Sequence, residues 1–188
     1  AEHDRTLVVA CWDEEERGLI GSIAAATRMS RAGSRVVANF NFEMIGYYSD
    51  EPNTQQFPQG FEFIFPEAAA AVTANENRGD FITNIGGDDA GPQLDALAKY
   101  GRALGLPTVS LALNKDLRSS PFLADLRRSD HAAFWAHGYP AIMLTDGANF
   151  RNSAYHCGSG PDAIARLDPV RASKVVAATV GAAAEALQ

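Results

Sequence analysis

The sequence predicts an α/β fold with a mostly parallel sheet, and two observations support this prediction. Short β-branched apolar runs, typical of buried strands, alternate with segments whose apolar residues recur at helical spacing. Near the start of the chain the order is strand, helix, strand, which is typical of a βαβ unit with parallel strands. The 188 residues contain no internal repeat and suit one domain with a hydrophobic core. We therefore expect a single domain over residues 1–188.

The first βαβ unit is predicted from residues 6–44. Residues 6–12 (TLVVACW) form a nearly continuous apolar run, which predicts a strand buried on both faces. A helix is expected over residues 18–31 with Gly33 as its C-cap. Residues 35–44 (RVVANFNFEM) alternate and predict the second strand. The predicted core side of the helix consists of Leu19, Ile20, Ile23, Ala26 and Thr27.

The middle of the chain begins with a long surface excursion over residues 47–66, which is rich in proline and phenylalanine. Loops of this length in compact domains are usually functional or disordered. A strand is expected at residues 81–85, and a helix at residues 93–104 that Gly105 ends. The stretch GGDDAG at residues 86–91 lacks the glycine spacing of a nucleotide loop, so we interpret it as a turn.

Two further strands are predicted in the second half of the chain. Residues 108–113 form an apolar run, followed by a polar loop over residues 114–128. Ser129 and Asp130 are typical N-cap residues for a helix ending at Gly138. Residues 140–145 (PAIMLT) predict a buried strand.

An irregular segment over residues 146–160 then leads to the last helix. Asp168 is expected to cap a helix over residues 169–187. Its predicted core side consists of Val170, Ser173, Val176, Ala177 and Val180.

Composition excludes several functional classes. The formal net charge of −7 argues against a surface for duplex nucleic acid, which needs clustered Lys and Arg. No run approaches the ~20 apolar residues of a membrane span. Cys11 and Cys157 permit one disulfide or none, their spacing matches no metal or redox motif, and they do not fix the compartment.

Polar groups collect after the predicted strands. In parallel α/β sheets, ligands bind beyond the carboxyl ends of strands. This rule brings together residues 13–16, Glu43, residues 128–131 and residues 146–157, which supply several carboxylates and His156. Carboxylate oxygen and imidazole nitrogen are zinc ligands. The chain contains no HExxH, P-loop or GxSxG motif.

Four segments together resemble the dinuclear zinc aminopeptidases, a family that includes glutamate carboxypeptidase II, glutaminyl cyclases and the transferrin receptor. The segments are WDEEERGLIGS from Trp12, NFEMIGYY from Asn41, RSDHAAFWAHGYPAIMLTD from Arg128 and YHCGSGPDAIARLD from Tyr155. They occur in the family's order. The resemblance implies a three-layer sandwich with a mostly parallel central sheet, helices on both faces, and zinc as cofactor.

The resemblance also implies roles for individual residues. Glu15 resembles the family's general base, and Glu16 resembles a zinc ligand. Glu43 occupies a position where the family usually has Asp as ligand to the other zinc, so this ligand carries an additional methylene. His156 corresponds to the family's final histidine ligand. Adjacent side chains diverge, so Glu15 can face a water molecule while Glu16 binds metal.

Tyr155 and Arg128 resemble residues that stabilise the developing oxyanion in some members. Without a catalytic role, Tyr155 would be a half-buried aromatic side chain and Arg128 a solvated charge in a loop. For Asp130 and His131 we favour helix capping and packing, and for Asp13 and Asp162 we favour capping or support of the ligands.

The family's HxD-type histidine ligand and bridging aspartate normally precede the paired glutamates. Here only His3 and Asp4 are available, on the wrong side of the predicted strand. We therefore expect the carboxyl-terminal part of a catalytic domain that lacks the family's amino-terminal strands and helix. Such a chain would hold one zinc ion or none, where the complete domain holds two, and would expose a sheet edge that favours self-association.

The leading functional hypothesis is a zinc-dependent exopeptidase, most specifically an aminopeptidase with peptide substrates, which would be inactive without the missing ligands. The alternatives are a non-catalytic binding or dimerisation domain of the same fold, and a glutaminyl cyclase-like acyltransferase. The family's habits alone favour a secreted or periplasmic location.

Overall fold

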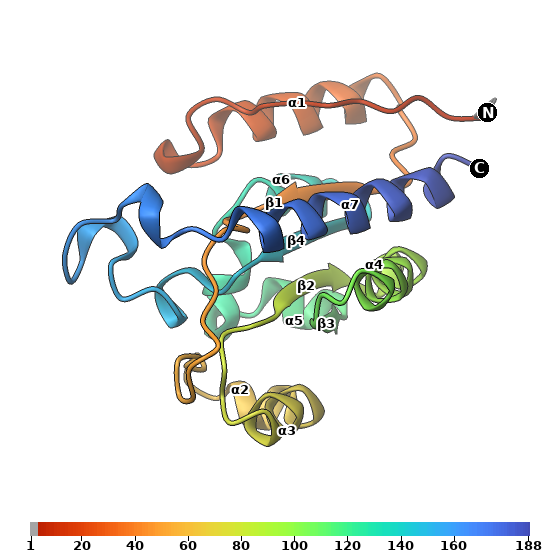
Figure 1. Cartoon of the computed structure of the whole chain (residues 1–188). Coiled ribbons are helices and arrows are strands. Elements are labelled where there is room, and N and C mark those ends of the chain that lie inside the picture. Colours follow the sequence, from red (N-terminus) through yellow and green to blue (C-terminus); the bar gives the residue numbers. More distant parts are fainter. Residues whose placement is uncertain (1–3) are drawn as a thin grey trace.

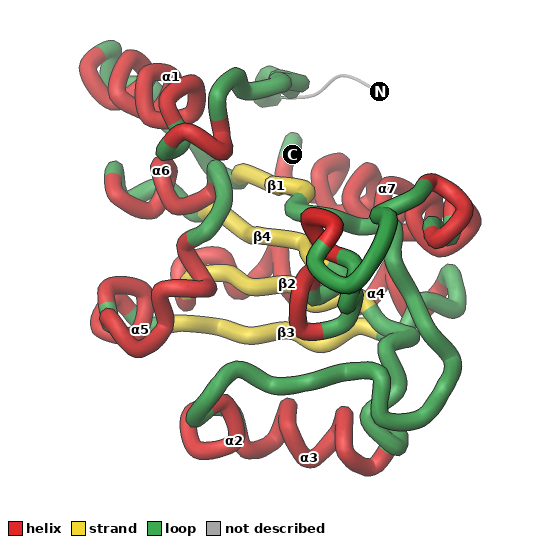
Figure 2. Tube along the Cα trace, turned by 90° about the vertical axis from the view of Figure 1, so that its left-hand side faces the viewer, coloured by secondary structure: helices red, strands yellow, loops and turns green. Residues whose placement is uncertain are grey.

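The computed structural model describes residues 4–188 and contains one four-stranded sheet. The strand order is β1-β4-β2-β3 (Figure 2). The strands are β1 (Asn39–Phe42), β2 (Ile82–Gly87), β3 (Thr108–Leu113) and β4 (Ala141–Thr145). β1 is parallel to β4 and β2 is parallel to β3, whereas β2 and β4 are antiparallel. The predicted α/β class with a mostly parallel sheet is therefore confirmed.

Helices lie on both faces of the sheet and beyond its two edges. α4 and α7 lie on one face, and α5 and α6 lie on the other (Figure 1). In Figure 2, α1 lies beyond β1, while α2 and α3 lie beyond β3. The helices are α1 (Ile20–Arg31), α2 (Phe61–Ile64), α3 (Pro66–Ala74), α4 (Gly91–Ala103), α5 (Lys115–Ser119), α6 (His131–Ala136) and α7 (Pro169–Ala186).

Of three hydrophobic clusters among the described residues, the two larger ones lie on opposite faces of the sheet, and the third joins α1 and α6. Ile82, Ile142 and Leu144 pack with α4 and α7 on one side. Ile85, Leu111 and Met143 point to the other side, because side chains alternate along a strand. Residues of α2, α3 and the segment before α6 pack against this second cluster. The functional site lies on the second face.

The strand predicted at residues 6–12 is wrong. Among the described residues its backbone has no strand pairing, and Val9 is 87% exposed. Asp4 N donates to Leu187 O (3.1 Å), so the segment begins at the end of α7 and not in the sheet. An apolar β-branched run indicates strand propensity, but a strand forms only where a neighbour pairs with it.

The predicted core side of α7 is also wrong. Val175, Ala178, Thr179 and Ala182 are its buried residues. Val170, Ser173, Val176, Ala177 and Val180 are exposed. α7 is apolar on both faces, so periodicity could not decide which face packs on the sheet. Asp168 caps the helix as predicted, accepting a hydrogen bond from Arg171 N (2.9 Å).

Smaller differences concern element boundaries. β1 covers only part of predicted residues 35–44, and the predicted loop 114–128 contains α5 and a 3-10 segment, Pro121–Arg127. On α1, Ser22, Ala25 and Ala26 are buried, whereas Ile20 and Ile23 are exposed.

The structure also bears on the cysteines and on membrane-spanning segments. Cys11 and Cys157 are both free thiols. No helix among residues 4–188 has the length and apolar character to cross a membrane. His3 lies outside the described residues.

Candidate active site

A pocket of about 360 Å³ lies beyond the carboxyl ends of β1 and β4, against the second face of the sheet. Glu15, Glu16, Glu43, Arg128 and Tyr155 all line it. These residues come from four separate segments of the chain. The strand-end rule therefore identified the correct edge, although β2 and β3 reach this edge with their amino-terminal ends.

A tight turn presents the paired glutamates. Glu15–Arg17 form one 3-10 turn, which Gly18 ends with a φ of 101°. Gly21 at the start of α1 passes so close to the backbone of Asp13 that a Cβ there would lie 2.6 Å from Asp13 N. Glycine at these two positions lets the chain reverse direction and leaves both glutamates at the pocket.

Glu43 directly follows β1, and its N–H donates to Leu144 O of β4 (2.9 Å). The buried Ser129 hydroxyl donates a hydrogen bond to the Glu43 carboxylate. Asn41 Nδ2 donates in turn to Ser129 Oγ (2.7 Å). Ser129 therefore fixes the orientation of Glu43. The sequence indicated Ser129 only as a helix-cap residue, and no local signal showed this second contact.

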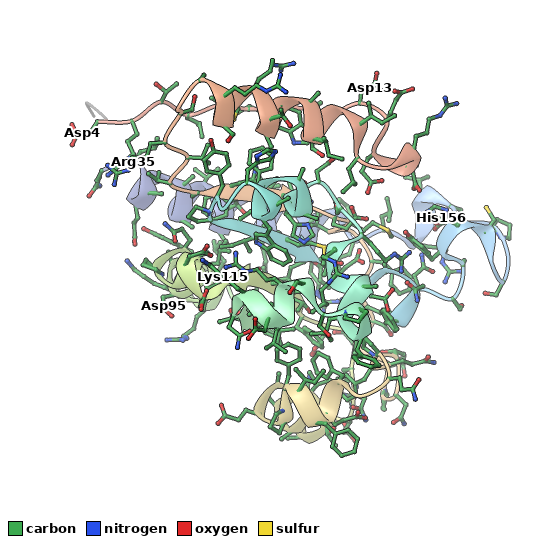
Figure 3. The ribbon with its side chains drawn as sticks, turned by 180° about the vertical axis from the view of Figure 1, so that it is seen from behind. Asp4, Asp13, Arg35, Asp95, Lys115 and His156 are labelled. Carbon is green, nitrogen blue, oxygen red and sulfur yellow. The ribbon has the colours of Figure 1, made fainter. Side chains whose placement is uncertain are left out.

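His156 reaches the glutamate turn from the last irregular segment. Its Nε2 lies 3.3 Å from Glu16 Oε1. Figure 3 shows His156 and Asp13 at the same end of the molecule, away from Asp4 and Arg35. The Tyr155 and His156 rings are adjacent, with centroids 4.2 Å apart. Two of the three predicted metal ligands are thus in contact.

Arg128 lies over the Tyr155 ring, with its guanidinium carbon 5.9 Å from the ring centroid. Its Nη1 donates to Asn149 Oδ1 (3.0 Å) and more weakly to Asp125 Oδ1 (3.4 Å). Because Arg128 and Tyr155 both line the pocket, one positive charge and one phenol are available beside the carboxylates.

Gathering acidic groups here changes their proton affinity. Burial, followed by the nearby charges of Glu43, Glu16 and Asp130, raises the pKa of Glu15 to about 7, while Arg128 opposes this shift. Burial also raises the pKa of Glu43, against the effect of the Ser129 hydrogen bond. Mutual repulsion of this kind is relieved when a cation binds.

Asp130 and His131 lie at the start of α6, as predicted. Asp130 is the N-cap residue, but its side chain makes no capping hydrogen bond. His131 is fully buried, Nε2–H donates to Leu126 O (2.9 Å), and its ring packs edge-on against Trp135. These observations fit the packing role that we favoured for His131. They do not support the capping role for Asp130.

Asp13 and Asp162 bond to neighbouring backbone and side-chain groups. Asp13 Oδ1 accepts from Glu14 N (2.9 Å). Asp162 Oδ1 accepts from Asn152 Nδ2 (3.3 Å).

Asp146 is a positioning residue that sequence reasoning placed at this sheet edge without giving it a role. It is buried, and its Oδ2 accepts hydrogen bonds from Gly46 N (2.9 Å) and Tyr47 N (2.7 Å). Its Oδ1 accepts from Ala148 N (3.0 Å). Asp146 therefore ties the segment after Glu43 to the segment that leads to His156. Only its position after a buried strand could have indicated it.

Left-handed backbone conformations are concentrated around these groups. Non-glycine residues with positive φ cost energy and persist where the surrounding structure holds them, often at functional sites. Those beside the candidate residues, or among them, are Glu14, Leu19, Met44, Ala148, His156 and Cys157.

The predicted ligands are of the types that bind zinc, but they do not lie close enough together to form a complete zinc site. Glu16 and His156 form a carboxylate and imidazole pair at 3.3 Å. Over residues 4–188, however, no three His, Cys, Asp or Glu side chains are close enough together to hold one ion. Glu43 lies in the same pocket as Glu16 but does not complete a group of three in this conformation.

Comparison with known proteins relates the chain to a family of peptidases. Residues 1–92 match the model of peptidase family M28. The chain is 30% identical over 158 residues to the uncharacterized protein YfbL of Escherichia coli (strain K12), a match that covers 84% of this chain and 43% of that protein. The chain thus spans less than half the length of this curated relative.

Among solved structures, the chain is similar to the LapA aminopeptidase of Legionella pneumophila. The TM-score is 0.57 at 18% identity, and the match covers 94% of this chain and 37% of that one. This likeness shows a shared fold.

Proposed function

We propose that this chain, whose residues 1–92 match the model of peptidase family M28, belongs to that family and carries part of the active site of a zinc-dependent aminopeptidase. The single observation that supports this best is the convergence of Glu15, Glu16, Glu43, Arg128 and Tyr155 on one pocket. The name of the Legionella structural neighbour agrees with the activity.

Zinc would be held by Glu16, His156 and Glu43. The first two already face each other, and Glu43 would have to move toward them. These residues suffice for one ion, because zinc sites in hydrolases commonly use three protein ligands and leave one position open. When bound, zinc lowers the pKa of a coordinated water to about 7.

Glu15 would act as general base. Glu15 is half-buried in the pocket next to Glu16. His156 contacts Glu16 and not Glu15, so Glu15 is free to face the water molecule. In this role it accepts a proton from the attacking water and delivers it to the leaving amine. The surrounding carboxylates and partial burial keep its proton affinity high enough for both transfers.

Arg128 and Tyr155 would stabilise negative charge on the carbonyl oxygen of the scissile bond. Both line the pocket, and the Arg128 guanidinium donates a hydrogen bond to Asn149 Oδ1 (3.0 Å). One such donor contributes on the order of 3 kcal/mol to the transition state.

We also propose self-association through the exposed apolar surface. β1 is an edge strand, Leu7, Val8 and Val9 are exposed, and Val170, Val176 and Val180 form a solvent-facing stripe on α7. Unpaired strand edges and contiguous apolar residues favour contact with another chain. A binding or dimerisation role without catalysis would use the same surface.

Because the family's histidine ligand and bridging aspartate precede the paired glutamates, the direct test is hydrolysis of aminoacyl 4-nitroanilides, with added zinc, by a version of this chain extended upstream. Chelator-sensitive release of nitroaniline is expected. If zinc does not support hydrolysis of any aminoacyl anilide, the aminopeptidase proposal is wrong and the binding-domain alternative is favoured. Conversion of N-terminal glutamine to a cyclic product in preference to hydrolysis would favour the acyltransferase alternative.

A further inference from the structure

Arg151 is a buried arginine that follows β4 and is only 6% exposed. Its guanidinium carbon lies 4.7 Å from the centroid of the Phe81 ring and 5.7 Å from that of the Tyr48 ring. Burial lowers the pKa of Arg151 to about 10, although the charge of Asp146 acts in the opposite direction. Because removing a cation from water is costly, a buried arginine persists only where its contacts compensate for that cost.

The guanidinium connects segments that are far apart in the sequence. Arg151 Nε donates to Gln55 Oε1 (2.8 Å). Arg151 Nη1 donates to Phe81 O (2.8 Å) and to Tyr47 O (3.3 Å). Arginine can hold several acceptors at once, because its donors form a rigid planar fork that the ammonium group of lysine lacks. Arg151 therefore anchors the end of its own loop to residues 47–55 and to the start of β2.

Two glycines make room for this anchor. A Cβ at Gly79 would lie 2.7 Å from Arg151 Cδ, so any other residue at Gly79 would collide with the arginine side chain. Gly147 has a φ of 101°, and a Cβ there would lie 3.3 Å from Gln55 Oε1. The contact between Arg151 and Gln55 is thus closely packed on both sides, which restricts the loop to one position.

The anchored loop is a short turn that carries Asn149. Ala148–Phe150 form a 3-10 turn directly before Arg151. Gln56 N donates to Phe150 O (2.8 Å), which ties the turn to the same segment that Arg151 holds. Asn149 is exposed on this turn and lines the pocket. Because the turn is held by both contacts, the position of Asn149 is fixed as well.

Asn149 in turn orients Arg128. Arg128 Nη1 lies 3.0 Å from Asn149 Oδ1, which is closer than its 3.4 Å contact with Asp125 Oδ1. The guanidinium of Arg128 is held in this way 5.9 Å from the centroid of the Tyr155 ring. We propose that Arg151 is a positioning residue, which acts through the turn of Asn149 to hold Arg128 in the orientation that stabilises negative charge on the substrate.

This inference rests on the proposed function for the role of Arg128, but the coupling between Arg151 and Arg128 can be tested without catalysis. Fluorine NMR of the zinc-free chain, labelled with 3-fluorotyrosine, gives one signal for each of the five tyrosines. Tyr155→Phe assigns the signal of Tyr155, which reports on the guanidinium beside its ring. Arg128→Met gives the position of this signal without that guanidinium. In Arg151→Lys we expect the Tyr155 signal to move towards that position.

Arg171→Lys is the matched control. Arg171 also lies over the Tyr48 ring, at 5.5 Å, but its side chain pairs with Asp50 and Asp168. The control makes the same chemical change at an arginine that does not hold the turn of Asn149, so it should leave the Tyr155 signal unchanged.

Asn149→Ala provides a second variant that does not disturb the core, because the side chain is exposed. It removes the acceptor of Arg128 and should move the Tyr155 signal in the same direction as Arg151→Lys does. Far-UV circular dichroism checks the fold of every variant. An unchanged Tyr155 signal in both variants, or an equal shift in Arg171→Lys, would overturn the inference.

Kinetics of the chain extended upstream then connect this coupling to catalysis. Arg128→Met should lower kcat for an aminoacyl anilide about 10²- to 10³-fold. Arg151→Lys should lower kcat about tenfold and change KM less than about twofold, because it weakens an interaction made in the transition state. In the Arg128→Met background, Arg151→Lys should change kcat by less than about twofold, because both substitutions then act on the same interaction. A further tenfold loss in the double variant would contradict action through Arg128.

The two proposals fail separately. Absence of hydrolysis in the extended chain contradicts the proposed function, and the fluorine signal of Tyr155 still decides the coupling. Hydrolysis together with an unchanged Tyr155 signal in Arg151→Lys and Asn149→Ala contradicts this inference and supports the proposed function.

Discussion

His156 Nε2 lies 3.3 Å from Glu16 Oε1, which joins the glutamate turn near the start of the chain to the irregular segment near its end. His156 has a φ of 51°, an unfavourable conformation for a histidine. Most of its side chain is exposed, so burial does not explain why the ring is held there. This contact is the observation behind our proposal that the two side chains share a cation.

Glu15→Gln should separate catalysis from metal binding. The amide keeps the size of the side chain but cannot accept a proton, so kcat for an aminoacyl anilide should fall about 10²- to 10⁴-fold. Zinc content, measured by mass spectrometry of the purified protein, should stay near that of the wild type. Near-normal turnover in this variant would show that another group acts as base.

Ser129→Ala should weaken zinc binding without removing a ligand. The change deletes the hydrogen bond to Glu43 and leaves Asn41 Nδ2 without its acceptor. Supporting contacts of this kind typically affect metal affinity by about 10- to 100-fold. Competition with a zinc chelator gives the affinity, and Ser173→Ala, which removes an exposed hydroxyl on α7, is the matched control. Equal affinity in the two variants would contradict the positioning role.

His131→Gln should make stability less sensitive to acid. Burial lowers the pKa of His131 from 6.5 to about 4, so between these values the unfolded chain binds a proton that the folded chain does not. Stability therefore falls as pH decreases through this window, by roughly 3 kcal/mol from this residue at pH 4. Urea unfolding at pH 7 and pH 4.5 should show a smaller loss in His131→Gln than in His137→Gln, where the histidine is exposed. The same loss in both variants would rule out His131 as the cause.

Val180→Glu should reduce self-association. Val180 is 62% exposed in the apolar stripe of α7, and a carboxylate there would have to be desolvated in any contact between chains. Sedimentation equilibrium of the wild type should show concentration-dependent association, with a dissociation constant at least about tenfold higher in the variant. Phe63→Glu changes an equally apolar but distant exposed residue on α2 and serves as control. A monomeric wild type at high concentration would remove the basis for this prediction.

The sequence predicted the α/β class and three of the four strands closely, because residues 81–85, 108–113 and 140–145 are apolar runs that pair within the sheet. It failed at residues 6–12, where the same composition finds no pairing partner among the described residues. It also failed on α7, whose Val170 and Val180 are as apolar as the buried Val175. A local sequence pattern indicates the propensity to form a strand or helix, whereas the burial of a side chain depends on which surfaces pack together in the fold.

The candidate site was predictable only where residue type carries the chemistry. Glu15, Glu16 and Glu43 stand out as carboxylates after apolar runs, and the pocket brings them together. Arg151 could not be recognised, because an arginine that anchors a buried loop and an arginine on the surface are identical in sequence.

Zinc binding to the purified chain tests the central claim most directly. Isothermal titration with zinc should give one binding event in the wild type, lost or weakened at least about tenfold in Glu16→Ala and in His156→Ala. Glu62→Ala and His137→Ala, which remove an exposed glutamate and an exposed histidine outside the pocket, should bind as the wild type does. Equal zinc affinity in all five proteins would contradict the assignment of Glu16 and His156 as metal ligands.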